Sequence, residues 1–124
     1  MQIEMKEFFV ITTSTDLVRV ESDSIIYISS DGNYSTLMLT NGESRIVTIQ
    51  LGQLEKLIAN QLHITGPNFI RIGKSLIINR TYIYYIHIPK QQLILSDGHN
   101  AQHTLSASRE ALKQLKDLID KELQ

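Results

Sequence analysis

Short runs of apolar, often β-branched residues fill the first half of the chain, and in residues 17–21 and 34–40 apolar positions alternate with polar ones. A period of two places alternate side chains on opposite faces of a strand, so this pattern predicts β-structure. Five strands are predicted in this half, at residues 8–13, 17–21, 25–28, 34–40 and 45–49. Asp31-Gly32-Asn33 and Asn41-Gly42 are tight-turn sequences, and we expect a hairpin at each.

The hydrophobic period changes twice to that of a helix. The first change predicts an amphipathic helix whose apolar side is formed by Leu51, Leu54, Leu57, Ile58 and Leu62. A second, longer helix is predicted at the end of the chain, where Ser106 or Ser108 can serve as the N-cap. Its expected apolar stripe consists of Leu112, Leu115, Leu118, Ile119 and Leu123.

Between these helices, residues 69–79 read F-I-R-I-G-K-S-L-I-I-N, with apolar flanks around a short polar centre. This pattern predicts two short strands joined by a tight connection. Three more strands are predicted at residues 82–88, 92–96 and 101–105, the last two joined by a turn over residues 97–100. The expected fold class is mainly β, with about ten short strands, one short central helix and a C-terminal helix, in one domain over residues 1–124.

The composition is that of a soluble globular protein, with 42% hydrophobic and 20% charged residues. The absence of cysteine excludes disulfides, thiol catalysis and cysteine-ligated zinc. The N-terminal residues lack the basic start and apolar core of a signal peptide, and no apolar run is long enough for a membrane helix. We therefore expect a cytoplasmic protein.

The net charge of −1 conceals a local asymmetry. Between Glu55 and Asp97 there is no acidic residue, and this span contains five cations: Lys56, Arg71, Lys74, Arg80 and Lys90. Such clustering is typical of a basic face for an anionic partner. The alternative is a strand-rich core segment that has few charges of any kind.

The polar centre of residues 69–79 suits an anionic ligand. Gly73 permits a positive φ, Lys74 supplies an ammonium group and Ser75 can donate or accept a hydrogen bond. The alternative is a simple tight turn that Lys74 keeps soluble. A phosphate-binding P-loop is excluded, because its upstream glycine is replaced by Asn68 and no helix is predicted to follow.

Arg109 stands at the predicted start of the last helix, where the helix dipole disfavours a cation. With Ser108 and the free amide groups of a helix N-terminus, it would form an anion site. The alternative is a solvated arginine. Neither the four histidines nor the set Asp97, His99 and Ser106 has the spacing of a metal site or a nucleophilic triad, so we expect no metal, no cofactor and no catalysis.

Taken together, these motifs resemble the LytTR DNA-binding domain of bacterial transcription regulators, over about residues 8–118. The resemblance rests on I-I-Y-I-S-S-D-G-N-Y at residues 25–34, Leu51-Gly52-Gln53-Leu54, the motif at 69–79, Tyr82-Ile83, Asp97-Gly98 and Ser108-Arg109. It implies an elongated stack of small β-sheets whose loops enter successive major grooves of duplex DNA.

The resemblance also assigns site residues. Base contacts are implied for Tyr34, with Asn33 beside it, for Lys74 and for Arg109, and phosphate contacts for Ser75, Lys90 and Ser108. The ammonium of Lys74 can also reach an adjacent phosphate instead of a base. One departure is Gly73, which stands where the family commonly has a histidine and leaves the loop free to move. Asn79 is expected to bond backbone at the end of its strand.

The implied activity is sequence-specific DNA binding at paired target sites, with a possible homodimer on the DNA. Most members of this family follow a receiver domain, for which this chain has no room, so we expect either a stand-alone regulator, which Met1 before an ordinary polar lead favours, or a fragment. A stand-alone regulator would respond to its expression level, an upstream regulatory partner or a membrane partner. The alternative is a β-rich protein-interaction module of the same fold that has lost DNA binding, which the near-neutral charge and Gly73 would favour.

Overall fold

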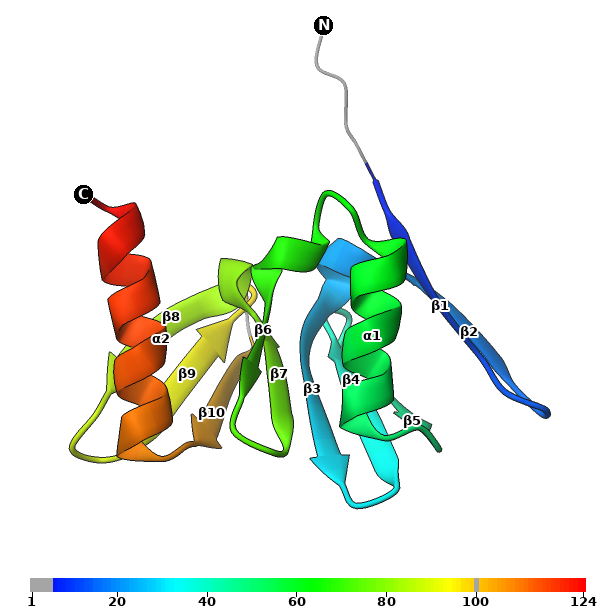
Figure 1. The fold of residues 1–124 in the computed structure, drawn as a ribbon, viewed down its shortest axis with the longest axis horizontal. Coiled ribbons are helices and arrows are strands. Elements are labelled where there is room, and N and C mark those ends of the chain that lie inside the picture. Colours follow the sequence, from blue (N-terminus) through cyan, green and yellow to red (C-terminus); the bar gives the residue numbers. More distant parts are fainter. Residues whose placement is uncertain (1–5, 100) are drawn as a thin grey trace, which may run out of the picture.

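Ten strands form three antiparallel sheets in the computed structural model, which describes residues 6–99 and 101–124 (Figure 1). Two α-helices accompany them, one between the strands and one at the end of the chain. The predicted mainly-β fold with a central and a C-terminal helix is therefore confirmed. Asn100, expected in the last hairpin turn, lies outside the described residues.

The first sheet is a two-stranded ribbon of β1 (Phe8–Thr12) and β2 (Leu17–Glu21). Phe9 and Ile11 are buried on its core-facing side, whereas Phe8 and Val10 on the other side are only partly buried. On the ribbon, the Arg19 guanidinium lies 3.7 Å from the centre of the Phe8 ring, a cation–π contact.

The second sheet has five strands in the order β5-β4-β3-β7-β6. Its strands are β3 (Ile25–Asp31), β4 (Tyr34–Leu39), β5 (Ser44–Val47), β6 (Phe69–Ile72) and β7 (Leu76–Asn79). Strand β3 runs three residues beyond the predicted 25–28, because Ser29, Ser30 and Asp31 pair with β4 although they are polar. The backbone hydrogen bonds of β3 thus continue beyond the residue at which the apolar pattern predicts its end.

Helix α1 (Leu51–Gln61) covers one face of this sheet (Figure 1). Leu51, Leu54 and Ile58 are buried in a core that includes Phe9 and Ile77. At the C-terminal end of the helix, Gln61 bonds the edge of the ribbon: its Oε1 accepts from Val10 N and its Nε2 donates to Val10 O, both at 2.9 Å. The predicted central helix is therefore present at the predicted position.

The third sheet has the order β10-β9-β8 and is formed by β8 (Ile83–His87), β9 (Gln92–Ser96) and β10 (Gln102–Ser106). Helix α2 (Arg109–Glu122) packs on it through Leu112 and Leu115, which are buried with Leu93 and Leu95. Within the described residues, no helix combines the length and the apolar character needed to cross a lipid bilayer.

The predicted apolar stripe of the last helix is wrong at two positions. Leu118 is 40% exposed and Leu123 is 80% exposed. Leu123 follows the last residue of the helix, which extends past the end of the sheet that it covers (Figure 1), whereas Leu118 lines an open hollow beside Ile70 and Ile72 of β6.

Asn79 ties the second sheet to the third. Its buried side chain donates from Nδ2 to Ile25 O at 3.0 Å and accepts at Oδ1 from Thr81 N at 3.1 Å. These bonds hold the turn of 3₁₀ helix at Arg80–Tyr82 that leads into β8. The expected strand-end role of Asn79 is confirmed.

Glu7 anchors the start of β1 to the segment that follows α1. Its carboxylate accepts hydrogen bonds from the backbone N–H groups of His63, Ile64 and Thr65 and from the Thr65 hydroxyl, at 2.6 to 3.1 Å. The hydrogen bonds from Thr65, followed by the other amides, lower the pKa of Glu7 from 4.5 to about 2. The sequence pattern alone did not single out this residue.

We expect acid to weaken the fold through Glu7. Because its pKa is lower in the folded chain, its contacts stabilise fully above the unfolded value of 4.5, and this contribution is lost as the pH falls towards about 2. Glu7→Gln should remove that part of the pH dependence. Urea denaturation from neutral pH down to about pH 2 measures it, with Glu43→Gln, in the exposed β4–β5 turn, as the matched control. Parallel pH curves for wild type and Glu7→Gln would contradict the prediction.

Candidate nucleic-acid interface

Three strand turns and the start of α2 lie along one edge of the molecule, the lower edge in Figure 1. They are the β3–β4 turn, the β6–β7 turn, the β8–β9 turn and the residues before α2. The structure brings all seven predicted site residues to this edge: Asn33, Tyr34, Lys74, Ser75, Lys90, Ser108 and Arg109. All seven are exposed.

In the β3–β4 turn, Gly32 has a φ of +66°, which glycine adopts without strain. Asn33 follows, and its Oδ1 accepts a hydrogen bond of 3.3 Å from Nε2 of Gln50, the residue just before α1. Tyr34 is 54% exposed at the start of β4. The turn therefore presents an amide and a phenol, with the amide held from the neighbouring helix.

In the β6–β7 turn, Gly73 has a φ of +62°, as its sequence position predicts. Lys74 is exposed, and among the described residues it forms no ion pair. The backbone oxygen of Ser75 accepts from Ser30 N at 2.8 Å, which leaves the hydroxyl of Ser75 at the surface. The turn is thus fastened to β3 at its base.

The β8–β9 turn and the start of α2 form one unit. Arg109 donates from Nη2 to Pro89 O at 3.2 Å, and Ala107 N donates to Gln91 O at 3.3 Å. Ser108 is the N-cap of α2, and its Oγ accepts from Ala111 N at 3.1 Å. Arg109 therefore has a local structural contact at the helix start, and Ser108 keeps its hydroxyl proton available for donation.

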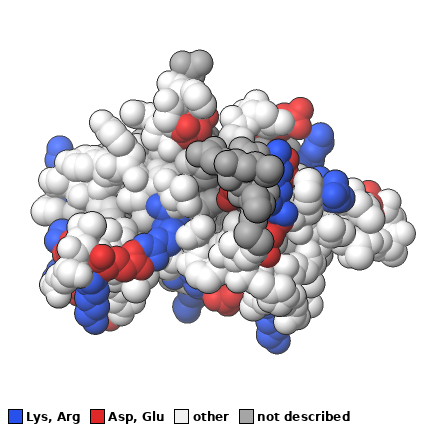
Figure 2. All heavy atoms as spheres, turned by 90° about the horizontal axis from the view of Figure 1, so that it is seen from above, with Lys and Arg blue, Asp and Glu red and all other residues white. Residues whose placement is uncertain are grey.

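The charges of this edge are mixed. Lys74, Lys90 and Arg109 are basic, while Asp31 and Glu110 in the same turns are acidic. On the opposite face, Lys and Arg side chains likewise lie among Asp and Glu side chains (Figure 2). The edge is therefore only moderately basic.

The five-cation face predicted from the sequence is smaller in the structure. Arg71 pairs with Glu55, and Arg80 pairs with Glu122 at the C-terminal end of α2. Both carboxylates lie outside the acid-free span in the sequence, but the folded chain places them next to its two arginines. Only Lys56, Lys74 and Lys90 of the five remain without an ion pair among the described residues.

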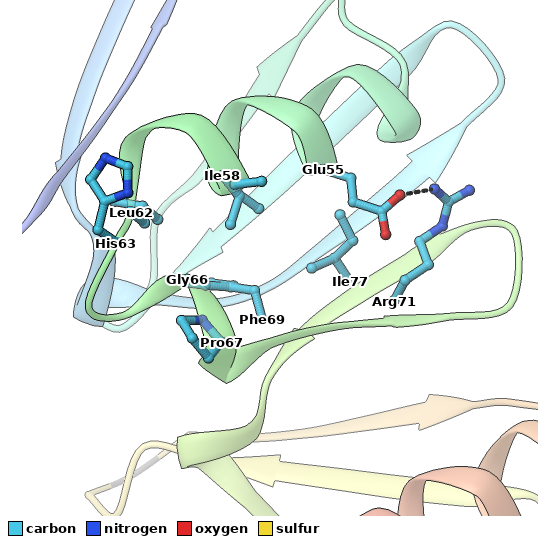
Figure 3. A pocket seen from close by; sticks show the side chains of 10 residues that line it. Glu55, Ile58, Leu62, His63, Gly66, Pro67, Phe69, Arg71 and Ile77 are labelled. Atoms are coloured by element: carbon cyan, nitrogen blue, oxygen red, sulfur yellow. Dashed lines mark hydrogen bonds and ion pairs between the residues drawn. The ribbon is translucent and has the colours of Figure 1, made fainter.

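A pocket of about 410 Å³ lies between α1 and the segment that leads into β6 (Figure 3). Ile58, Leu62, Phe69 and Ile77 form much of its wall. The ion pair between Glu55 and Arg71 lies at one end, and His63 lies at the other (Figure 3). Nothing in the sequence pattern indicated this pocket, because its wall comes from three separate elements.

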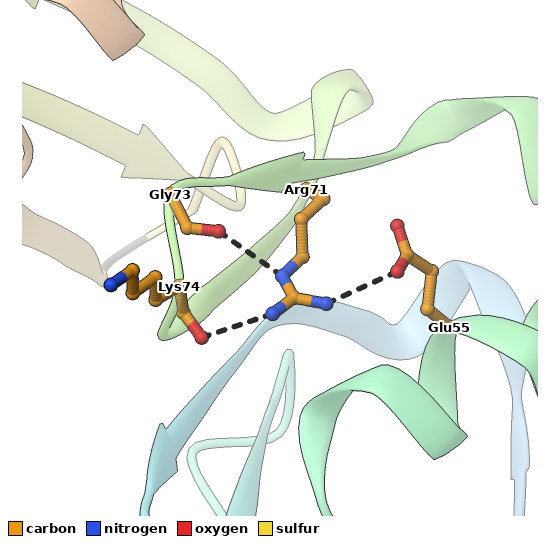
Figure 4. Close-up of polar contacts among 4 residues, drawn as sticks. All are labelled: Glu55, Arg71, Gly73 and Lys74. Atoms are coloured by element: carbon orange, nitrogen blue, oxygen red, sulfur yellow. Dashed lines mark hydrogen bonds and ion pairs between the residues drawn. The ribbon is translucent and has the colours of Figure 1, made fainter.

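Arg71 connects this pocket to the β6–β7 turn (Figure 4). It donates from Nε to Gly73 O and from Nη2 to Lys74 O, and from Nη1 to Glu55 Oε1, each at 3.1 Å. The expectation that Gly73 leaves this loop free to move is therefore wrong: two of its carbonyl groups are held by one guanidinium.

The residues of a nucleophilic triad lie apart. Ser106 pairs with Gln92 at the start of β9, whereas Asp97 follows the end of that strand, roughly 16 Å away at the usual rise per residue. His103 packs edge-on against Tyr27, with ring centres 5.5 Å apart. Among residues 6–99 and 101–124, no group of three or more His, Asp or Glu side chains is arranged to hold a metal ion.

Comparisons with known proteins agree with this geometry. The chain is similar to a solved LytTr DNA-binding domain from Bacillus cereus, with a TM-score of 0.63 and 16% sequence identity over 93% of this chain and 98% of that chain. No curated protein sequence matches it. The family model of the LytTr DNA-binding domain, a domain of transcription regulators, matches residues 15–120. This match covers most of the sequence, and the chain therefore belongs to the LytTR family of DNA-binding domains.

Proposed function

We propose that this domain binds duplex DNA sequence-specifically and regulates transcription by inserting its edge turns into successive major grooves. The observation that supports this most is the alignment of three turns and the α2 start along one edge (Figure 1). These turns come from two different sheets, and their positions are set by the packing between the sheets. A row of projecting turns suits a groove that winds past one side of the protein.

The base contacts would come from Asn33, Tyr34, Lys74 and Arg109. Arginine and lysine match the two acceptors of guanine in the major groove, and asparagine matches the donor and acceptor of adenine. Arg109 uses one hydrogen bond on Pro89 O, which orients its guanidinium and leaves other N–H groups for a base.

The phosphate contacts would come from Ser75, Lys90 and Ser108. Hydroxyl and ammonium groups bond phosphate oxygens without selecting a base, so they set the register of the protein on the duplex. Ser108 sits at the N-terminus of a 14-residue helix, whose free amide groups and dipole favour a phosphate. Each residue proposed to contact a base thus has a residue proposed to contact a phosphate in the same turn or in the next one.

Two copies on paired target sites fit the small number of contacts. A single module with about four base-reading side chains buries a modest surface, and the described residues of these turns include three cations, Lys74, Lys90 and Arg109, to neutralise phosphates. We infer that the functional unit is one domain over residues 1–124, paired on DNA, and controlled in the cytoplasm by its abundance or by an upstream regulatory or membrane partner.

The alternative function is a protein-interaction module of the same fold. The mixed charge of the edge favours it, because Asp31 and Glu110 oppose a DNA backbone. The same edge would then bind a protein, and duplex DNA would show no sequence preference. The next three experiments separate the two functions.

Affinity for a cognate duplex should fall with salt. Each neutralised phosphate contributes roughly −0.9 to the slope of log K against log salt, so the three edge cations predict a slope of about −3. Fluorescence anisotropy from low to moderate salt measures it. Lys90→Ala should reduce the slope by about 1, whereas Lys121→Ala, at the far end of α2, should leave it unchanged. A slope near zero for wild type would favour a protein partner.

Arg109→Ala should lose more affinity for the specific duplex than for random DNA. Removing a bidentate donor to guanine costs roughly 1–3 kcal/mol at the preferred base. Arg109→Lys keeps the charge and should lose most of the same discrimination, since an ammonium lacks the forked geometry. Ser75→Ala should weaken both duplexes to a smaller and similar extent. Competition binding with specific and scrambled duplexes measures the affinities of each variant. If Arg109→Ala lost the same factor in affinity for both duplexes, the start of α2 would have a structural role and not a base-reading one.

A duplex with two target sites should bind two copies more tightly than a single site binds one. The second copy gains from proximity along the same DNA, so the affinity per copy should rise. Native mass spectrometry of the protein with single-site and double-site duplexes of equal length counts the copies bound. Equal affinity per copy on both duplexes would contradict pairing.

A further inference from the structure

The pocket between α1 and β6 has the dimensions of a ligand site. Its volume of about 410 Å³ falls in the range of about 300–1,000 Å³ that small-molecule sites occupy. Its wall is largely apolar, through Ile58, Leu62, Phe69 and Ile77, and its few polar groups are gathered at the two ends (Figure 3). The DNA-facing edge uses none of these four side chains.

At the Arg71 end of the pocket, one of the two ion-paired side chains is fixed by further hydrogen bonds, and within the described residues the other has none beyond the pair. Arg71 is fixed by two backbone carbonyls of the β6–β7 turn, and its side chain is 31% exposed. Glu55 contributes a single hydrogen bond from the side of α1 that lines the pocket, and its side chain is 53% exposed. Glu55 can therefore turn into solvent at small cost, whereas Arg71 cannot leave without releasing the turn.

We propose that this pocket binds a monocarboxylate with an apolar body, such as an aryl or alkyl acid, whose head group replaces Glu55 on Arg71. The exchange keeps the guanidinium paired, because one carboxylate takes the place of another. The gain comes from the apolar body, which leaves water to lie against Ile58, Leu62 and Phe69.

The head group on Arg71 has a consequence at the β6–β7 turn. The guanidinium bonds Gly73 O and Lys74 O, and these carbonyls belong to the peptide groups of the Lys74 and Ser75 amides. A carboxylate that binds the guanidinium redistributes its donors and changes the environment of both amides. If Lys74 and Ser75 contact DNA as proposed, the bound ligand changes the conformation of the β6–β7 turn and so its DNA contacts. This last step alone rests on the proposed function.

The binding test contains no DNA, so its outcome is independent of the proposed function. Phenylbutyrate is titrated into the full chain while amide resonances are followed by NMR. We expect saturable shifts at pocket residues such as Ala59 and Phe69, and also at the amides of Lys74 and Ser75. Phenylbutanol, which lacks the charge, and phenylbutylamine, which reverses it, should bind more weakly. Equal or tighter binding of either analogue would overturn the assignment of a carboxylate.

Two pairs of variants test the location. Ala59→Trp places a large ring at the exposed wall of the pocket and should abolish the shifts, while Asn60→Trp, one residue on and outside the pocket, should leave them intact. Glu55→Gln removes the competing carboxylate and should tighten phenylbutyrate binding by about two- to fivefold, the range that an exposed ion pair is worth. Lys56→Gln, on the same helix and outside the pocket, is its control.

Besides the analogue result, four results would overturn the proposal. The first is a titration without saturable shifts in a chain whose spectrum is that of a folded protein. The second is binding that Ala59→Trp does not affect. The third is weaker binding to Glu55→Gln, and the fourth is a set of shifts that omits Lys74 and Ser75. A positive titration with a chain that fails to bind DNA would support the ligand site and count against the proposed function only.

Discussion

The structure depends on strand β7, whose four residues are all buried because both faces of the second sheet are covered. Ile77 packs in the core under α1, and Leu76 and Ile78 pack in the core under α2. No position on such a strand can be solvated, so Leu76, Ile77 and Ile78 are consecutive apolar residues, and the buried Asn79 that follows has its amide hydrogen-bonded. Strand β3 is shared in the same way, with Ile25 and Ile28 in the first core and Ile26 in the second, so these two paired strands join the two cores.

Local chemistry explains how much of the fold could be predicted. Asn41-Gly42 and Asp31-Gly32 specify hairpins through residues that accept a positive φ, and both glycines have one. The leucine spacing from Leu51 specifies α1 in the same local manner. In contrast, Leu118 and Leu123 fit a helical stripe yet stay exposed, because periodicity describes a helix face and not the extent of the surface that it meets.

The candidate site was predictable where it consists of turn residues and not where it depends on distant partners. Lys74 and Arg109 stand out in the sequence because each is a cation in an unusual local position. The Arg71 contact to Glu55 spans 16 residues and the Glu7 contact to Thr65 spans 58, so no local pattern reveals either. The predicted basic face was overestimated for the same reason, since the partners of Arg71 and Arg80 come from other parts of the chain.

The bonds of Gln61 to β1 have a consequence for how copies of this protein behave in a crowded solution. Strand β1 is paired with β2 on one side only, and an unpaired strand edge is a template on which a foreign strand can add. Gln61 occupies both outward backbone groups of Val10, so its amide imitates the missing neighbour in the middle of the strand. An added strand would have to break two hydrogen bonds before forming its own there. A side chain at the end of a helix thereby blocks the addition of a foreign strand at this point of the edge.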